Sequence, residues 1–397
     1  MGNTRLAVVG LGVITGTQTG RSRRMLVSEA ARLAIEDAGL DKSQINGAIE
    51  MRAAPGGGDR VNYSDGFPRI LNLPVNFYFS IGRGGALASL GIAAAYSFLD
   101  RGLADYVVIS GATDVRSLAE SARARGHRGR PHDLAKEGYW GSPVGELRAM
   151  SHHSWMAARH MAVYGTTSEQ LGAIAVQIRE WAQRNPEAQM YGKPMTLEDH
   201  QSSPMLVDPY HLCDVAQVSD GACAFIISTE DRARDLKQVP VQILGQGFGD
   251  VAATLWWDKL NYTQMAIKTA RDAAFSQAGI TLDDLDAAML YDCFSAEVLF
   301  QLEGYGWAPL GEGGAFAQTG AIGPGGSIPI NTSGGLLSAY HMDDLTGFIE
   351  AVRQLRGESK DRQVVGAKTV MFTSHGGEML SPGMCSIHAS TILGVGR

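Results

Sequence analysis

The chain has 397 residues, a net charge of −7 and a pI near 5.8, and 45% of its residues are hydrophobic. This length exceeds the usual single-domain size, so we expect two or more packed units around a large core. The acidic balance argues against nucleic acid or an anionic membrane as the main partner. No apolar run approaches the ~20 residues that a membrane span needs.

The compartment can be predicted from the N-terminus and the cysteines. The chain begins with a strand-like Leu6–Val9 segment instead of a charged and then apolar signal peptide. The four cysteines are scattered and form no Cys-x-x-Cys pair; they are Cys213, Cys223, Cys293 and Cys385. This usage suits a reducing cytoplasm and excludes a metal site built on cysteines. We therefore predict a cytoplasmic protein.

The first predicted unit is of the α/β type. It runs from a strand at Leu6–Gly10 through a helix at Val27–Ala38 to a strand at Ala48–Met51. The 49 glycines of the chain cluster at such strand–helix junctions. Alternation of this kind is typical of α/β proteins.

Part of this unit occurs again later in the chain. The segment Ala38–Ile49 matches Ala278–Met289 without a gap, with apolar residues at the same positions. The later copy also begins with a predicted strand at Val241–Leu244 and an amphipathic helix at Thr263–Ala278. The same pattern of elements is therefore written twice.

A second repeat follows the first in the same order. Gly84-Gly85 opens a predicted Ala-rich helix, and Gly334-Gly335 is predicted to open another. A core strand follows each, at Tyr106–Ser110 and at Thr369–Thr373. Two repeats in one order indicate gene duplication and a pseudo-twofold axis.

We divide the chain into four segments on this basis. Residues 1–115 begin the N-terminal half, 116–165 form an inserted loop or lid region, 166–235 complete that half, and 236–397 form the C-terminal half. The insert is rich in histidine: His127, His132, His152, His153 and His160. Their spacing matches no known ligand pattern, so we expect no metal site.

Three motifs resemble those of the thiolase superfamily, in its sterol-carrier-protein-X-like branch. Ser203–Pro209 and Val218–Ala224 are similar to the end of that branch's first half, and Tyr291–Ser295 is similar to its His-Asp-Cys-Phe-Ser motif. Asn331–Gly335 and then His341 stand where the family has Asn-Pro-Ser-Gly-Gly and Gly-His-Pro. The resemblance implies an α/β thiolase fold, in which two duplicated βαβαβαββ halves form a five-layer αβαβα core.

The catalytic cysteines of a thiolase are missing. The family's nucleophile stands at the start of the first glycine-rich helix, and the matching residue is Ser80; the second cysteine falls near Ser374–Gly377. A thiolate is nucleophilic near neutral pH, whereas a serine hydroxyl needs a base such as His341. We favour Ser80 as a small residue left at the former nucleophile position. Cys293 and Cys385 are interpreted as core residues.

Two tyrosines replace other residues of the motifs. Tyr291 takes the place of the motif histidine, and Tyr340 that of the glycine before His341. This pair resembles the cysteine-less steroid side-chain-cleaving aldolases, the lipid-transfer-protein/thiolase-like retro-aldolases. The resemblance implies that these two tyrosines act as base and acid, with His341 as a further catalytic group. We assign Tyr291 as the base and Tyr340 as the acid, and the reverse order stays open. The reaction would split a β-hydroxyacyl-CoA, such as a 17-hydroxy steroid carboxyl-CoA, into a ketone and propionyl-CoA.

Retro-aldol chemistry fits the loss of sulfur because it needs no covalent intermediate. It needs a base for the β-hydroxyl proton, donors that hold the thioester enolate, and an acid. The backbone N–H groups of Gly376 and Gly377 are candidates for the enolate site, with Asn331 or the motif histidine nearby. Asp343 and Asp344 either orient that histidine or cap a helix, and both readings stay open.

Two rival functions remain. One is a thiolase-type acyltransferase with Ser80 or Cys293 as nucleophile, and the other is a non-catalytic thiolase-like subunit that serves as a platform. The resemblance also implies a homodimer and a small zinc-ribbon/OB-fold partner protein that covers the acyl-CoA substrate. We expect no cofactor, since CoA is part of the substrate.

Overall fold

The first half of the chain forms a mixed sheet of five strands. The computed structural model describes residues 4–51, 66–82, 84–124, 149–250, 266–376 and 387–396. The strands lie in the order β3-β2-β4-β7-β1. Their bounds are β1 Leu6–Gly16, β2 Gly47–Met51, β3 Phe77–Ile81, β4 Val107–Asp114 and β7 Asp220–Thr229. β2 is parallel to β3 and β4, and β7 is antiparallel to β4 and β1.

The second half repeats this order in the sheet β8-β11-β10-β9. Its strands are β8 Val241–Asp250, β9 Ala287–Met289, β10 Thr369–Gly376 and β11 Ile387–Gly394. Ile330 bridges in parallel to Ala288 of β9 and so takes the place that β3 has in the first half. β1 and β8 pair briefly, at Ala7 and Val8, and this joins the two sheets at one edge.

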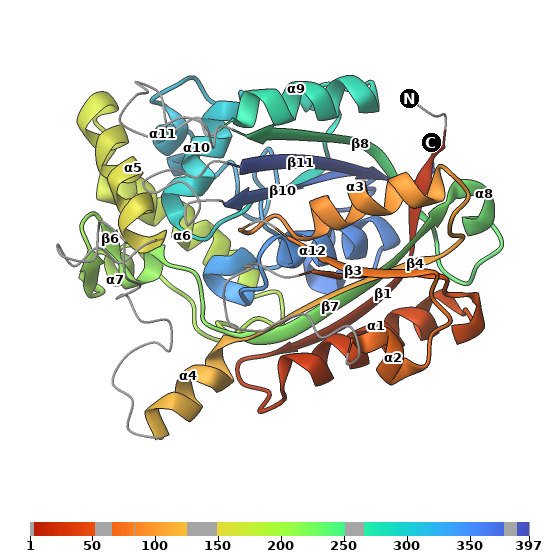
Figure 1. The fold of residues 1–397 in the computed structure, drawn as a ribbon. Coiled ribbons are helices and arrows are strands. Elements are labelled where there is room, and N and C mark those ends of the chain that lie inside the picture. The colour runs from red at the N-terminus through yellow and green to blue at the C-terminus, as the bar shows by residue number, and fades with distance from the viewer. Residues whose placement is uncertain are drawn as a thin grey trace.

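Helices fill the space between the sheets and cover their outer faces (Figure 1). α1 (Arg23–Ala38) and α2 (Phe67–Leu71) lie outside the first sheet, and α9 (Ile267–Ala278) and α10 (Ser295–Tyr305) outside the second. α3 (Ala88–Leu99) and α12 (Asp344–Arg356) lie between the sheets. The five layers and the duplication confirm the expected thiolase fold.

The two halves also share a close helix–sheet contact. A Cβ atom on Gly10 of β1 would lie 2.3 Å from the carbonyl oxygen of Ala34 in α1. A Cβ atom on Gly245 of β8 would lie 2.2 Å from the carbonyl oxygen of Ala274 in α9. Only glycine permits these approaches, so the same requirement is met twice.

The repeated segment forms the same turn in both halves. The 3₁₀ turns η1 (Lys42–Gln44) and η7 (Leu282–Asp284) each begin with a capping box, from Asp41 and from Thr281. A capping box satisfies two backbone groups at the start of a turn. The sequence repeat therefore reflects a repeat of local hydrogen bonding.

The helix expected to open at Gly334-Gly335 is different from its counterpart, and here the expectation was wrong. The segment forms a five-residue π-helix, η8 (Gly335–Ala339), and the long helix α12 begins only at Asp344. The buried carboxylate of Asp292 accepts the N–H groups of Leu336 and Leu337, at 2.8 and 3.3 Å, which holds this turn. Tyr340 is then extended and ends the turn.

Further helices and a hairpin lie at one end of the two sheets (Figure 1). They are α4 Val115–Ala124, α5 Ala149–Tyr164, α6 Ser168–Ala182, α7 Leu197–Ser202, β5 Met205–Val207, β6 Tyr210–His211, η4 Leu212–Asp214 and α11 Gly313–Gln318. α8 Glu230–Ala233 and η9 Lys360–Arg362 are short connections. The segment expected to be an inserted loop thus contains most of α4 and all of α5, and its boundaries stay predictions. In the ranges given above, no helix is long and apolar enough to cross a membrane.

Candidate functional site

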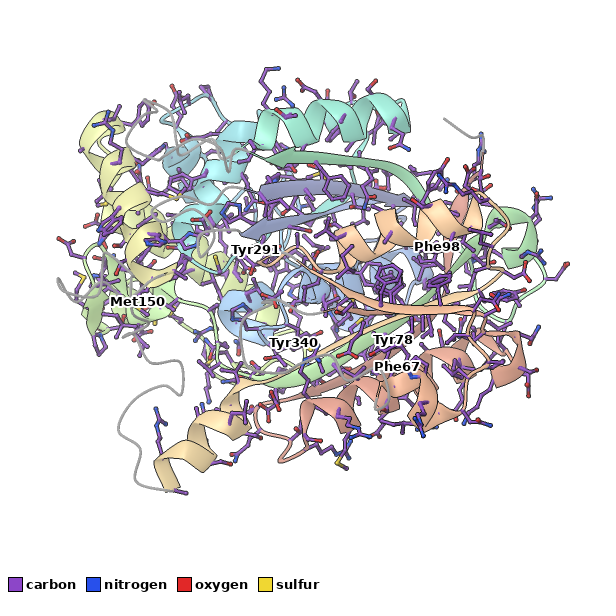
Figure 2. All side chains as sticks on the ribbon, viewed as in Figure 1. Phe67, Tyr78, Phe98, Met150, Tyr291 and Tyr340 are labelled. Atoms are coloured by element: carbon purple, nitrogen blue, oxygen red, sulfur yellow. The ribbon has the colours of Figure 1, made fainter. Side chains whose placement is uncertain are left out.

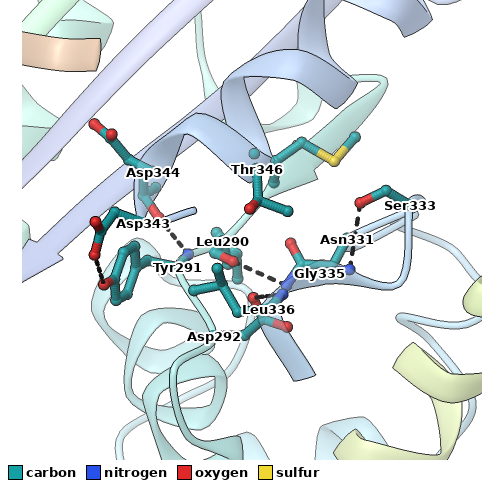
Figure 3. A pocket seen from close by; sticks show the side chains of 13 residues that line it. Leu290, Tyr291, Asp292, Asn331, Ser333, Gly335, Leu336, Asp343, Asp344 and Thr346 are labelled. Atoms are coloured by element: carbon teal, nitrogen blue, oxygen red, sulfur yellow. Dashed lines mark hydrogen bonds between the residues drawn. The ribbon is translucent and has the colours of Figure 1, made fainter. Parts of the chain in front are cut away.

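Tyr291 lies just beyond β9, where the second sheet approaches α3. Its backbone N–H donates to the Thr373 hydroxyl at 2.8 Å, which fixes the loop against β10. Its phenol donates to Oδ1 of Asp343 at 3.2 Å (Figure 3). A Cβ atom on Gly85 would lie 2.4 Å from the phenol oxygen and 2.3 Å from the carbonyl oxygen of His375. The hydroxyl therefore lies between the carboxylate of Asp343 and the backbone of Gly85, which has no side chain.

Asp343 connects this tyrosine to His341. Nε2 of His341 lies 3.8 Å from the same carboxylate oxygen that receives the Tyr291 hydroxyl. The His341 side chain is 35% exposed and that of Asp343 22%. An imidazole, a carboxylate and a phenol thus follow one another from the surface inward, an order that suits proton transfer.

Asp344 caps α3 from a distant part of the chain. Its buried carboxylate accepts the N–H groups of Leu87, Ala88 and Ser89 at 2.9–3.2 Å, and the Ser374 hydroxyl at 2.6 Å. Burial raises the pKa of this carboxyl group to about 6, against the effect of these donors. A helix N-terminus favours an anion. In this chain the carboxylate of Asp344 occupies the N-terminus of α3, so Asp344 serves as a helix cap.

Asp292 and Asn331 hold the loops around the tyrosine. Burial raises the pKa of Asp292 to about 7. Asn331 has a positive φ of 52°, which asparagine tolerates, and its amide donates to the carbonyl oxygen of Leu290 at 2.9 Å. This donor is engaged with the backbone next to Tyr291. The geometry therefore gives Asn331 a positioning part, and its predicted contact with the enolate stays a prediction.

These residues line one cavity (Figure 3). Tyr291, Asp292, Asn331, Asp343 and Asp344 all contribute to its wall. Its volume is about 10 Å³, the room of roughly one water molecule. Tyr291 and Asp343, the candidate proton-transfer groups, thus lie in the wall of this small cavity.

Tyr340 lies apart from this cavity (both tyrosines are labelled in Figure 2). It is 2% exposed and belongs to the hydrophobic cluster around α3 and α12, whereas Tyr291 belongs to the cluster beside α10. Its hydroxyl has no hydrogen-bond partner in the described part of the chain, and burial raises its pKa. The structure therefore does not bring the two predicted catalytic tyrosines together.

The other predicted site residues are divided between places. Ser80 lies within β3, opposite Glu50 of β2, and not at the N-terminus of α3. Gly376 ends β10, and a Cβ atom there would lie 2.5 Å from the backbone nitrogen of Gly85. Gly376 is thus beside Tyr291, as expected of an enolate donor, although no contact tests that role. Gly377 lies outside the described residues, as does Cys385.

Sequence reasoning missed a buried cluster of His153, Glu297 and His375. The Glu297 carboxylate bonds Nδ1 of His153, and its other oxygen is 3.2 Å from Nε2 of His375. Burial opposes ionisation of Glu297, but the two histidines lower its pKa, and burial lowers that of His375 to about 3. The three residues come from α5, α10 and β10. Only the fold joins them, so no local spacing could reveal the cluster.

Comparison with known proteins decides the family. Residues 254–394 match the model of the family described as "Thiolase C-terminal domain-like". The chain is 33% identical to a steroid side-chain-cleaving aldolase of Thermomonospora curvata, over 89% of this chain and 90% of the relative. It is also 33% identical to the 17-hydroxy-3-oxo-4-pregnene-20-carboxyl-CoA lyase of Mycobacterium tuberculosis, over 93% and 95% of the two chains.

The chain belongs to the family of steroid side-chain-cleaving aldolases. A solved Ltp2-ChsH2(DUF35) aldolase has the same fold, with a TM-score of 0.83 and 31% identity over 99% of this chain and 98% of that one. Human mitochondrial 3-ketoacyl-CoA thiolase in complex with CoA superposes with a TM-score of 0.70 at 14% identity, over 99% and 98% of the chains. The likeness to the thiolase concerns the fold alone. The aldolases of this family therefore share the thiolase architecture.

Proposed function

We propose that the protein is a carbon–carbon lyase that splits a β-hydroxyacyl-CoA by a retro-aldol reaction. The observation that carries this proposal is the hydrogen bond from the Tyr291 phenol to Asp343 in the cavity beside Gly85. It places a phenol and a proton acceptor side by side, while no cysteine stands at Ser80 or within Ser374–Gly377, the segments matched to the two thiolase cysteines. The 33% identity to a steroid side-chain-cleaving aldolase supports the same reaction.

The first step removes one proton from the substrate and leaves one additional proton on His341. The phenol oxygen of Tyr291 takes the proton of the substrate β-hydroxyl, while its own proton passes to Asp343 and onward to His341. The alkoxide becomes a ketone as the Cα–Cβ bond breaks, and the electron pair of that bond forms the thioester enolate. A phenol alone is a weak base at neutral pH, and sustaining a phenolate there would require about 4 kcal/mol. The relay through Asp343 reduces this requirement, because the phenol gives up its proton as it accepts another.

The second step returns a proton to the α-carbon of the enolate. The predicted enolate donors are the backbone N–H groups of Gly376 and Gly377, which would stabilise the developing negative charge. Gly376 packs against the backbone of Gly85, and the Cβ position of Gly85 lies next to the Tyr291 hydroxyl. The assignment of Tyr340 as the acid rests on the resemblance. Its buried hydroxyl lacks a partner in the described ranges, and such a group costs about 1–3 kcal/mol.

The substrate and the partners are proposed from the relatives. The M. tuberculosis relative is named for a 17-hydroxy steroid carboxyl-CoA, and we propose a thioester of that class, with propionyl-CoA as the short product. The related Ltp2-ChsH2(DUF35) aldolase combines two named components, which supports a small partner protein for this chain, in addition to a homodimer. A cytoplasmic location completes the proposal.

The test is a turnover assay with defined products. The chain, alone and co-expressed with a DUF35-type partner, is incubated with a 17-hydroxy steroid acyl-CoA, and the products are identified by mass spectrometry. We expect a 17-ketosteroid and propionyl-CoA in equal amounts, without consumption of free CoA. Tyr340→Phe should slow turnover at least a hundredfold if Tyr340 is the acid. Products that appear only when free CoA is added would indicate an acyltransferase instead, and no turnover with any partner would favour a platform.

A further inference from the structure

The buried cluster of His153, Glu297 and His375 has the composition of a metal site. The ligand atoms of these three side chains all lie within 4.8 Å of one another. Their side chains are 2%, 0% and 0% exposed. They come from α5, α10 and β10, so the cluster joins three separate elements.

Hydrogen bonding within the protein leaves this cluster incomplete. One oxygen of Glu297 bonds Nδ1 of His153. The other oxygen is 3.2 Å from Nε2 of His375, but the two atoms do not have the geometry of a hydrogen bond. Among the described residues, neither this oxygen nor either nitrogen of His375 has a hydrogen-bond partner. Buried polar atoms are nearly always paired, so a carboxylate oxygen and an imidazole nitrogen that face each other unpaired point to a missing cation.

We propose that His153, Glu297 and His375 bind one divalent first-row transition-metal ion of the zinc class. Two imidazoles and one carboxylate are the ligand set of several zinc enzymes, and they leave a coordination position open. Imidazole donors favour zinc, iron or cobalt over magnesium and calcium, which prefer oxygen alone. Ligand atoms around tetrahedral zinc lie roughly 3.4 Å apart, given bonds of about 2.0–2.2 Å. The 3.2 Å between the Glu297 and His375 atoms agrees with that spacing.

The surroundings orient the ligands for this role. Sγ of Cys293 is 3.9 Å from Nε2 of His153, so the opposite nitrogen, Nδ1, faces Glu297. Outer contacts of this kind fix the ring of a metal-binding histidine. The rings of Tyr291 and His375 are 6.0 Å apart, yet none of the three ligands lines the cavity of Figure 3. The ion would therefore hold α5, α10 and β10 together behind the proposed catalytic groups.

The test measures metal directly and needs no turnover. The full-length chain is stripped with a chelator and titrated with Co²⁺, whose visible d–d absorption reports coordination by nitrogen and oxygen. We expect one Co²⁺ per chain, displaced by one Zn²⁺, with affinity reduced more than tenfold in Glu297→Gln and in His375→Gln. The matched control is His160→Gln, because His160 pairs with Glu303 at 3.0 Å in a second buried His–Glu contact that has no third ligand in the described ranges. It should bind Co²⁺ as the wild type does.

Two results would overturn the proposal. One is a folded wild-type chain that shows no saturable Co²⁺ absorption, and this result does not depend on the variants folding. The other is equal Co²⁺ binding by the wild type and by folded Glu297→Gln and His375→Gln. Either result would identify the cluster as a metal-free array of two histidines and a carboxylate.

Discussion

Asp344 allows a quantitative test of how α3 is anchored. Its carboxylate receives the N–H groups of Leu87, Ala88 and Ser89 and the hydroxyl of Ser374. Burial raises its pKa from 3.8 to about 6. Because the folded protein holds this proton more tightly than the unfolded chain does, protonated Asp344 adds stability that is complete below about pH 4. That stability is lost as the pH rises through about 6.

The size of the effect follows from the two pKa values. The difference between 3.8 and about 6, at about 1.36 kcal/mol per pH unit, corresponds to about 3 kcal/mol. Asp344→Asn keeps an oxygen acceptor for the helix but cannot titrate. The free energy of unfolding of the wild type, relative to that of the variant, should therefore fall by about 3 kcal/mol between about pH 4 and pH 7. Urea unfolding of the full chain, followed by circular dichroism at several pH values, measures this difference.

A matched variant separates titration from packing. Ser374→Ala removes a hydroxyl that lowers the pKa of Asp344 but keeps the carboxyl group. Its stability should begin to fall at the same pH as that of the wild type, but the fall should extend to higher pH and be larger, because only the pKa of the folded state rises. A constant difference in stability between the wild type and Asp344→Asn across this pH range would refute the reasoning.

Three further variants test other parts of the site. Tyr340→Phe should raise the free energy of unfolding by about 1–3 kcal/mol, because it removes a buried hydroxyl without a described partner; a denaturant titration checks this, and a loss of stability would contradict it. Gly85→Ala should lower kcat more than tenfold, because the added Cβ would meet Tyr291 and the carbonyl of His375; steady-state kinetics like those of the wild type would refute this contact. S80C should form no acyl adduct with acyl-CoA in intact-protein mass spectrometry, since position 80 lies in a strand, whereas an adduct there would restore the acyltransferase reading.

Much of the fold could be predicted because the chain repeats itself. The repeat of Ala38–Ile49 at Ala278–Met289 corresponds to the same turn in both halves, and the flanking strands occupy equivalent places in their sheets. The helix predicted to open at Gly334-Gly335 was wrong because the conformation there depends on Asp292, which lies far away in the sequence. Its carboxylate holds a π-helical turn that glycine spacing alone does not reveal.

Residues of the site could be predicted only where they lie within or next to a recognisable sequence motif. Tyr291 was found from a substitution within a motif, and its partner Asp343 was noticed with its role left open. The cap of α3 by Asp344 spans 257 residues between Leu87 and the aspartate, so local sequence could not reveal it. The Tyr340 side chain packs into the hydrophobic cluster around α3 and α12. This packing is a property of the folded core, so the sequence alone could not reveal it.

The central claim is that the Tyr291 hydroxyl accepts the proton of the substrate. The most direct measurement is the kcat of Tyr291→Phe, assayed with the partner protein and a 17-hydroxy steroid acyl-CoA. The melting temperature of the variant should be close to that of the wild type, which shows that the variant is folded. The account predicts a kcat lower by about 10²–10⁴ and no covalent acyl adduct on either protein. A variant that retains more than a tenth of the activity, or a wild-type enzyme trapped with an acyl group on any side chain, would contradict it.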